Sequence, residues 1–310
     1  MNTGNNKWGI IYHPRAGTRK ARKRWTAIRA YIDSKQINYD YVQSLGYGAV
    51  QRLAHDYAEQ GYRTIVIVGG DGALNDAING IMTAKTSFPK DEIAIGIIPN
   101  GVVNDFSRYW GIDMDYKAAV DWIVNYRLKK IDVGQCTYYN GTIHESKYFV
   151  NAINIGLGAR IVRITDQTKR FWGITLISSV AALFKIFFER KLYRMHLRIN
   201  EDHIRGRIMN VCVGSARGYG MTPSAVPYNG WLDVSVIYYP KIWQLLKGLW
   251  MLINGRLLNH KDVKSYRTKR VRVLRAQNAA VGIDGRILQE KHLPLDITIM
   301  PETLTLIIPN

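Results

Sequence analysis

The sequence predicts a protein of two domains, an α/β domain with a parallel sheet followed by an antiparallel, β-rich domain. The chain has 310 residues, which is enough for two domains that each bury a core. Short apolar runs alternate with helical patterns from Trp8 to Ile131, which indicates a parallel sheet covered by helices. Beyond Ile131, strand-like runs separated by Gly, Asn and Pro indicate antiparallel pairing. We therefore expect domains at 1–135 and 136–310, with the last strands returning toward the first domain.

In the first domain, short apolar runs predict strands, and apolar residues that recur every three or four positions predict helices. The run Thr64–Val68 is β-branched throughout, which is typical of a strand buried on both faces. In chain order we expect strands at Trp8–Tyr12, Tyr39–Val42, Thr64–Val68 and Ile93–Ile98, and helices at Lys20–Ser34, Val50–Gln60 and Ala73–Met82.

In the second domain, the run at 171–188 is the best candidate for a membrane span, but it contains Lys185, two serines and a threonine. Because a span needs about 18 to 20 nearly uncharged residues, a buried or interfacial helix is the better interpretation. The aromatic residues of the two expected helices are typical of a core, and contact with lipid is the alternative. We expect strands at 148–155, 193–200, 207–213, 232–238, 269–275 and 295–308, and helices near 172–189 and 241–254.

Charge is the unusual part of the composition, because 43 Lys+Arg against 24 Asp+Glu give a formal net charge of +19. Hydrophobic residues at 47% exclude a disordered chain. Two cysteines exclude a disulfide framework and a four-cysteine zinc site, which favours a reducing, cytoplasmic setting. The positive charge indicates nucleic acid, an anionic lipid surface or a phosphorylated small molecule as partner, and a solvated basic face is the alternative.

The sharpest local pattern is a buried strand that ends in Gly69-Gly70-Asp71-Gly72 and passes at once into a helix. This turn points the N–H groups of the helix N-terminus at its contents, and glycines let a phosphate approach the backbone. A carboxylate beside phosphate is repulsive unless a cation lies between them, so Asp71 indicates a metal-nucleotide. A plain strand-to-helix turn with an Asp N-cap would look the same.

Two further loops follow strands of the same expected sheet. Asn104-Asp105 opens a helix after the strand at Ile93–Ile98, and His13–Gly17 follows the first strand. Because the carboxyl ends of parallel strands meet at one edge, we expect Asp71, Asp76 and Asp105 around one site.

The sequence resembles the bacterial diacylglycerol kinase and lipid kinase family, relatives of the sphingosine kinases and more distantly of the NAD kinases. The resemblance spans nearly the whole chain in five ordered segments: HPRAG, GGDGALNDAINGI, PNGVVNDFSRYWGI, GYGMTPSAVPYNGWLDV and GIDGR. It implies an α/β nucleotide-binding domain and a C-terminal β-sandwich, with ATP and Mg²⁺ in the cleft between them. It further implies transfer of the γ-phosphoryl group to the hydroxyl of a lipid such as diacylglycerol, and it is compatible with a homodimer.

Carried over residue by residue, the resemblance implies a nucleotide-linked Mg²⁺ near Asp71 and Asp105, a weak second-domain metal site at Asn229, and catalytic roles for Asp71 and Asp284. The implied nucleotide contacts are His13, Pro14, Arg15, Ala16, Gly17, Ser44, Gly69, Gly70, Asp71, Gly72, Ala73, Leu74, Asn75, Asp76, Gly101, Val102, Asn104 and Asp105.

The sequence also departs from the family pattern. Ala73 and Val102 stand where the family has threonine, and Asn229 stands where it has an aspartate metal ligand. Arg286 replaces the glutamate of the family's Asp-Gly-Glu, which is treated as the general base, and arginine cannot accept a proton. Either Asp284 performs that task, or the activity is lowered, altered or lost; a general base typically contributes about 10²- to 10⁴-fold.

These observations favour an ATP- and Mg²⁺-dependent lipid kinase that acts on a lipid alcohol at an anionic membrane surface, as a cytoplasmic, peripherally associated protein. A catalytically weakened or inactive nucleotide-binding protein of the same fold is the alternative. NAD kinase activity is a lesser rival, because the Gly-Gly-Asp-Gly turn is shared. We expect no nucleic-acid partner, because no zinc finger, helix-turn-helix or RNA-binding aromatic pattern accompanies the charge.

Overall fold

The computed structural model forms two compact units, which are described separately. One comprises Met1–Val133 and Pro301–Asn310, and the other Gly134–Met300. The structure describes residues 7–14, 19–46, 48–101, 104–112, 114–139, 141–160, 191–238, 242–288 and 292–309. The helix expected near 172–189 lies outside the described residues.

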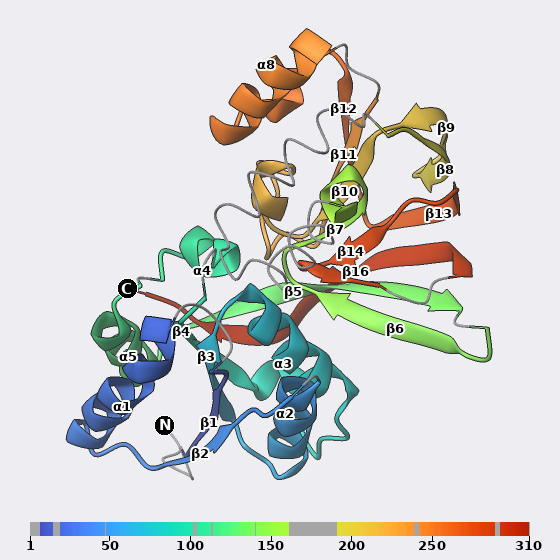
Figure 1. Cartoon of the computed structure of the whole chain (residues 1–310). Coiled ribbons are helices and arrows are strands. Elements are labelled where there is room, and N and C mark those ends of the chain that lie inside the picture. Colours follow the sequence, from blue (N-terminus) through green and yellow to red (C-terminus); the bar gives the residue numbers. More distant parts are fainter. Residues whose placement is uncertain are drawn as a thin grey trace. The chain divides into compact units, whose positions relative to one another are not determined.

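The first unit alternates strands and helices, as expected (Figure 1). Its elements are β1 (Trp8–Tyr12), α1 (Arg19–Ser34), β2 (Tyr39–Gln43), α2 (Ala49–Glu59), β3 (Thr64–Gly69), α3 (Asp71–Thr83), a 3-10 turn (Lys90–Glu92), β4 (Ala94–Pro99), α4 (Asp105–Tyr109) and α5 (Tyr116–Asn125).

The strands of the first unit form a parallel sheet in the order β2, β1, β3, β4. The end of the last strand, β16 (His292–Ile307), runs parallel beside β4, with Thr305 opposite Ala94. Since all these strands point the same way, the loops that follow them leave from one edge of the sheet.

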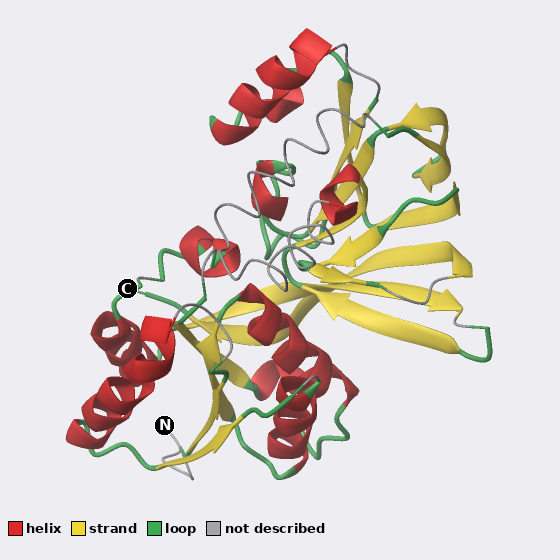
Figure 2. Cartoon of the chain, in the orientation of Figure 1, coloured by secondary structure: helices red, strands yellow, loops and turns green. Residues whose placement is uncertain are grey.

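Helices cover both faces of this sheet, with α1 and α5 on one side and α2 and α3 on the other (Figures 1 and 2). Strands β1, β3 and β4 are buried at every position, because a parallel sheet between two helical layers has no solvated face. The core under α1 and α5 joins Ile28 and Ile32 of α1 to Ile123 of α5 and to Val66 of β3.

The described residues of the second unit lie mostly in strands. Strand β5 (Leu128–Tyr139) enters it from the first unit, and the unit also holds β6 (His144–Phe149), β7 (Ala152–Gly156), β8 (Tyr193–Ile199), β9 (Asp202–Ile208), β10 (Asn210–Gly214), β11 (Leu232–Ile237), α8 (Ile242–Ile253), β12 (Val263–Thr268), β13 (Arg270–Ala276), β14 (Val281–Ile283), β15 (Arg286–Ile287) and most of β16. Two 3-10 turns lie at Gly218–Gly220 and Leu257–Asn259.

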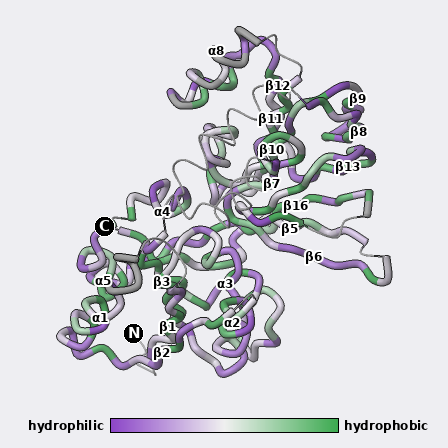
Figure 3. Tube along the Cα trace, in the orientation of Figure 1, coloured by the Kyte–Doolittle hydropathy of each residue, from purple (hydrophilic) through white to green (hydrophobic). Residues whose placement is uncertain are grey.

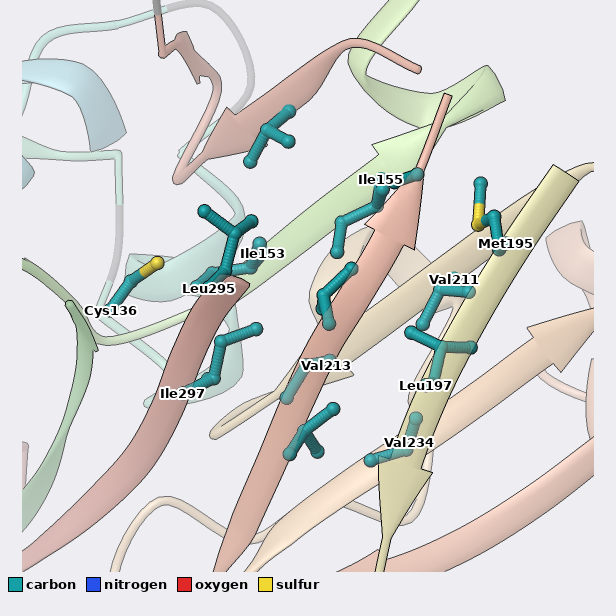
Figure 4. Close-up of a cluster of buried hydrophobic side chains, with 14 of the residues drawn as sticks. Cys136, Ile153, Ile155, Met195, Leu197, Val211, Val213, Val234, Leu295 and Ile297 are labelled. Carbon is teal, nitrogen blue, oxygen red and sulfur yellow. The ribbon is translucent and has the colours of Figure 1, made fainter. Parts of the chain in front are cut away.

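These strands form a sandwich. One sheet has the order β12, β11, β10, β7, β14, β15, and the other places β16, β13, β8 and β9 side by side. Their inner faces share one apolar core, in which Ile153 and Val211 of the first sheet meet Leu197 and Ile297 of the second (Figure 4). The predicted fold class, an α/β domain with a parallel sheet followed by a β-sandwich, is confirmed.

Two of the expected strands are wrong in their extent. The run 148–155 is divided into β6 and β7, because the chain turns at Val150–Asn151. The run 207–213 is divided at Met209, where the chain passes from β9 in one sheet to β10 in the other. In each run an asparagine, Asn151 or Asn210, is the local sign of the break, and the turn itself is held by tertiary hydrogen bonds. Helix α5, strands β5, β12, β14 and β15, and most of β9 were not predicted.

Within the described residues, no helix is both long enough and apolar enough to cross a membrane.

Candidate functional site

The described parts of the loops after β1, β2, β3 and β4 leave one edge of the sheet, and they carry most of the residues predicted in the first domain. Backbone hydrogen bonds continue from strand to loop: His13 N to Val68 O (3.0 Å), Ser44 N to Tyr12 O (2.9 Å) and Asn100 N to Gly69 O (2.8 Å). The hydrogen bonding of the sheet thus continues for one residue beyond β1, β2 and β4.

At the β1 and β2 end of this edge, His13 and Ser44 are hydrogen-bonded. His13 Nδ1 lies 2.7 Å from Ser44 Oγ, and Ser44 is buried. A side chain added at Gly69 would lie 3.7 Å from the Cβ atom of His13, so the end of β3 is their neighbour. The predicted contacts His13, Ser44 and Gly69 therefore share one corner.

At the β3 and β4 end, two glycine loops touch backbone to backbone. A Cβ atom on Gly101 would lie 2.6 Å from Gly70 Cα, and one on Gly70 would lie 2.9 Å from Gly101 Cα. Asn104 closes the second loop in the left-handed conformation (φ 49°): its Oδ1 accepts from Gly101 N (3.2 Å), and its Nδ2 donates to Gly101 O (3.0 Å). Only glycine permits this approach at either position.

Asp71, the first residue of α3, ties the two loops together. Its carboxylate accepts hydrogen bonds from Asp105 N (2.9 Å) and Phe106 N (3.1 Å), so it caps the start of α4. Burial raises the pKa of Asp71 above its ordinary value, and the two backbone amides oppose that shift. The loop bonds only partly offset the desolvation of this carboxylate.

The other α3 residues that the sequence predicted as nucleotide contacts differ in their exposure to solvent. Ala73, Leu74 and Asn75 are buried, whereas Asp76 is half-buried. Pro14 is half-buried beside His13, and Gly72 lies in the first turn of α3. The predicted contacts Arg15, Ala16, Gly17 and Val102 lie outside the described residues.

In the second unit, Asp284 is buried between β14 and β15. Its carboxylate accepts three backbone hydrogen bonds, from Val150 N (2.9 Å), Asn151 N (3.1 Å) and Ala152 N (2.8 Å). Asp284 itself has a left-handed backbone (φ 43°), as does Gly285 (φ 77°). This carboxylate holds the turn between β6 and β7, and both of its oxygens are engaged in doing so.

Asn229, the predicted second-domain ligand, lies in a local turn. Its Oδ1 accepts from Trp231 N (2.9 Å), and Gly230 between them has a left-handed backbone (φ 71°). Across the described part of the chain, no group of three or more His, Cys, Asp and Glu side chains could hold a metal. A metal at Asn229 would therefore need water or carbonyl ligands.

Sequence reasoning missed several residues that shape these loops. Asn100 is buried and joins the β3 and β4 ends, and in the second unit Asn151 Oδ1 accepts from Gly218 N (2.8 Å) while Asn210 Oδ1 accepts from Gly158 N (2.8 Å). The feature of the sequence that could have identified these three residues is an asparagine at the end of an otherwise apolar run.

Comparison with known proteins agrees with this architecture. The chain is 22% identical over 287 residues to a diacylglycerol kinase of Staphylococcus saprophyticus, covering 89% of this chain and 87% of the relative. It is 26% identical over 254 residues to a probable lipid kinase YegS-like of Pseudomonas syringae pv. tomato, covering 79% and 76%. The crystal structure of a putative diacylglycerol kinase from Bacillus anthracis superposes with a TM-score of 0.75 over 99% of both chains at 20% identity, a likeness of fold.

The chain thus has two domains, a parallel α/β unit with paired glycine loops at a helix N-terminus and a β-sandwich. The model of the diacylglycerol kinase catalytic domain matches residues 7–136, and that of the YegS C-terminal NAD kinase beta sandwich-like domain matches residues 151–308. The chain belongs to this diacylglycerol kinase and YegS-like lipid kinase family, and it is a kinase by class. The predicted family is confirmed.

Proposed function

We propose that the protein is an ATP- and Mg²⁺-dependent lipid kinase that transfers the γ-phosphoryl group to a lipid hydroxyl such as that of diacylglycerol. The observation that carries the proposal is the tie between Asp71 and the amides of Asp105 and Phe106, which joins two glycine loops at the N-terminus of α3. Relatives named diacylglycerol kinase support the choice of acceptor.

The glycine loops suit a nucleotide phosphate. Gly70 precedes α3 without a side-chain cap, so the start of this 13-residue helix offers backbone N–H groups and the positive end of its dipole. His13 and Ser44, which are hydrogen-bonded to each other, border the same edge. We assign phosphate binding to the loops at Gly69–Asp76 and Gly101–Asp105, with His13–Gly17 and Ser44 as further contacts.

The residues present also fit Mg²⁺. This cation takes one or two carboxylates, and its remaining ligands are water and substrate phosphate. Asp71 and Asp105 supply carboxylates at the phosphate loop, and a cation would offset the burial that raises the pKa of Asp71. When bound, Mg²⁺ would neutralise charge that develops on the transferring phosphoryl group.

The geometry favours a positioning role for Asp284. Both oxygens of this buried carboxylate already accept backbone hydrogen bonds, three in all, so the group is poorly placed to accept a proton from a substrate hydroxyl. Arg286 is half-buried and cannot act as a base. Since phosphoryl transfer depends mainly on positioning and charge stabilisation, a kinase without a strong base keeps part of its rate.

A lipid alcohol as phosphoryl acceptor implies that the reaction takes place at a membrane surface. A net charge of +19 attracts the protein to anionic lipid, which holds the proposed substrate. We propose a cytoplasmic protein that associates peripherally with this surface.

The test is phosphorylation of a lipid panel with labelled Mg-ATP by the wild-type chain and by Asp71→Asn. We expect a labelled lipid from the wild type and a loss of about 10²-fold or more in the variant, typical of a charged group at a phosphoryl-transfer site. Asp56→Asn, which removes a carboxylate with 48% side-chain exposure from α2, is the matched control and keeps full turnover. Equal activity in Asp71→Asn, or no labelled lipid from any acceptor, contradicts the proposal.

The alternative function, nucleotide binding without turnover, is favoured by the engaged oxygens of Asp284 and by Ala73, Val102 and Arg286. Titration with Mg-ATP separates the two functions: affinity that depends on Asp71, in a chain that labels no lipid, supports the alternative. Incubation with NAD and Mg-ATP tests the lesser rival, because formation of NADP would identify an NAD kinase.

A further inference from the structure

One outer sheet face of the second unit is crowded with arginine. Strands β8 and β9 alternate between apolar residues such as Met195 and Leu197, which enter the core, and basic residues that point away from it. The hydrophilic stretches of these strands are visible in Figure 3. Eight basic residues at outward positions of β8, β9 and β13 are here called the arginine face: Arg194, His196, Arg198, His203, Arg205, Arg207, Arg272 and Arg275. Arg270, also outward on β13, is paired with Asp296.

The strand register places like charges directly opposite one another. Arg194 of β8 pairs with Arg207 of β9, and Arg198 of β8 pairs with Arg272 of β13. Opposite residues of an antiparallel pair have Cβ atoms about 4.5 to 5.5 Å apart, so like charges there repel and destabilise the sheet. The face is therefore not explained by its contribution to folding.

Few carboxylates offset this charge. Asp296 lies beside Arg272, with 3.9 Å between Oδ2 and Nε, and Glu201, 93% exposed, lies 3.3 Å from Arg198. Asp296 is shared with Arg270. Among the residues that the structure describes, Arg194, Arg207 and Arg275 form no ion pair with an acidic side chain.

Protection of a sheet edge explains only part of the face. Charged residues on an edge strand prevent pairing with other chains, and β9 is such an edge. Strands β8 and β13 are interior, paired on both sides, yet they carry five of the eight basic positions of the face: Arg194, His196, Arg198, Arg272 and Arg275. An anionic partner accounts for these interior charges.

We propose that the arginine face binds the phosphate groups of an anionic phospholipid surface, an inference that rests on the proposed lipid kinase function. Guanidinium groups bind phosphate through paired hydrogen bonds, and several unpaired ones on one face suit a surface of many phosphates. None of the outward positions is Phe, Tyr or Trp, so the face lacks the stacking platform that single-stranded nucleic acid requires. Of the two anionic partners compared, the phospholipid surface that contains the proposed substrate therefore fits the arginine face better.

The test measures binding of the full chain to sedimented vesicles of phosphatidylcholine with about one third phosphatidylglycerol, at low and high salt. The test variant carries Arg194→Gln, Arg207→Gln and Arg275→Gln. The control variant carries Arg52→Gln, Lys85→Gln and Arg127→Gln, which are exposed in the first unit and remove the same charge. Since each basic residue near an anionic surface contributes roughly a fivefold change in affinity, we expect the test variant to bind about 10- to 100-fold more weakly.

The control variant should lose less than about threefold, and the difference between the variants should shrink at high salt. The test variant should also melt no lower than the wild type, because it relieves the repulsion between Arg194 and Arg207. Equal losses in both variants would show diffuse attraction and overturn the proposal. Unchanged vesicle binding with lost affinity for a duplex DNA oligonucleotide would overturn it in favour of nucleic acid.

Kinase activity on diacylglycerol in neutral detergent micelles separates this inference from the proposed function. Test variant and wild type should be equally active there, because the micelle carries no anionic phosphate. A wild type without lipid kinase activity would refute the proposed function, whereas the vesicle comparison would still decide what the arginine face binds.

Discussion

Two aspartates, one in each unit, follow a buried strand and precede a glycine, yet their surroundings differ. The carboxylate of Asp71 accepts two hydrogen bonds from backbone amides at the start of α4, and burial raises its pKa. Asp284 accepts three amides from the turn between β6 and β7 and has a left-handed backbone. Both carboxylate oxygens of Asp284 are therefore occupied by hydrogen bonds that hold the fold. The two hydrogen bonds of Asp71 compensate only part of the cost of burying its charge. The comparison shows that the same Asp-Gly pair can cap a neighbouring helix in one place and hold a strand-to-strand turn in another.

The largest expected effect is a loss of stability when the hydrogen bonds of Asp284 are removed. Asp284→Ala leaves the amides of Val150, Asn151 and Ala152 without their acceptor inside the second unit. Because each buried unsatisfied donor costs about 1 to 3 kcal/mol, we expect the free energy of unfolding to fall by about 3 to 6 kcal/mol. Urea denaturation of the full chain measures it. Asp202→Ala, an exposed carboxylate on β9, should change it by less than about 0.5 kcal/mol.

The second expected effect separates function from stability at Asp71. Asp71→Asn keeps one carbonyl oxygen for the amides of α4, so unfolding should become easier by only about 1 to 2 kcal/mol, while Mg-ATP binding and turnover fall strongly. Isothermal titration with Mg-ATP, alongside denaturation, checks the split. If Asp71→Asn destabilises the chain as much as Asp284→Ala and leaves nucleotide affinity intact, the two aspartates have the same structural role.

A third prediction concerns the close approach of the glycine loops that Asp71 joins. Gly101→Ala places a methyl group 2.6 Å from Gly70 Cα and from Asn104 Oδ1, so the loops must move apart. We expect a loss of about 1 to 3 kcal/mol in the free energy of unfolding, together with weaker Mg-ATP binding. In Gly248→Ala of α8 the nearest atom would be 3.9 Å away, so this helix should gain up to about 1 kcal/mol. Equal nucleotide affinity in both variants would count against a phosphate site between the loops.

The smallest expected effect is a dependence on pH. The folded chain raises the pKa of Asp71, so the folded state binds the proton more tightly than the unfolded state. The contribution of Asp71 to stability is therefore full below its ordinary pKa and is lost as the pH rises through the raised value. Denaturation across this acid range should show the loss in the wild type and in Asp56→Asn, and not in Asp71→Asn. Saturating Mg²⁺-nucleotide should reduce it, because a cation favours the charged carboxylate.

Much of the fold could be predicted from local pattern. Apolar runs bounded by turn residues located β1, β3 and β4 to within one or two residues, because strands buried on both faces have unmistakable composition. The breaks at Val150–Asn151 and at Met209 could not be predicted, because they are fixed by partners far along the chain: Asp284 for the first, and for the second the carbonyl of Ile237, which accepts from Met209 N at 2.9 Å.

The candidate site was predictable in its location and less so in its contacts. The sequence indicated that the loops carrying His13, Asp71 and Asp105 would meet, since parallel strands end at one edge. It did not indicate that the carboxylate of Asp71 would cap α4, nor that His13 would bond Ser44, 31 residues away. The roles of Asp71 and Asp284 as proton acceptor or metal ligand stay predictions.

The sequence by itself determined the two-domain class, the family and the position of the glycine loop at Gly69–Gly72, because glycine, aspartate and β-branched runs have strong local preferences that do not depend on distant residues. Only the tertiary structure decided how each aspartate is used and that the arginines of β8, β9 and β13 share one face. Both depend on which amide or strand is brought opposite a side chain, and that register is set by long-range pairing rather than by neighbouring residues. The net charge of +19 was visible in the composition, and the fold gathered part of it onto one sheet.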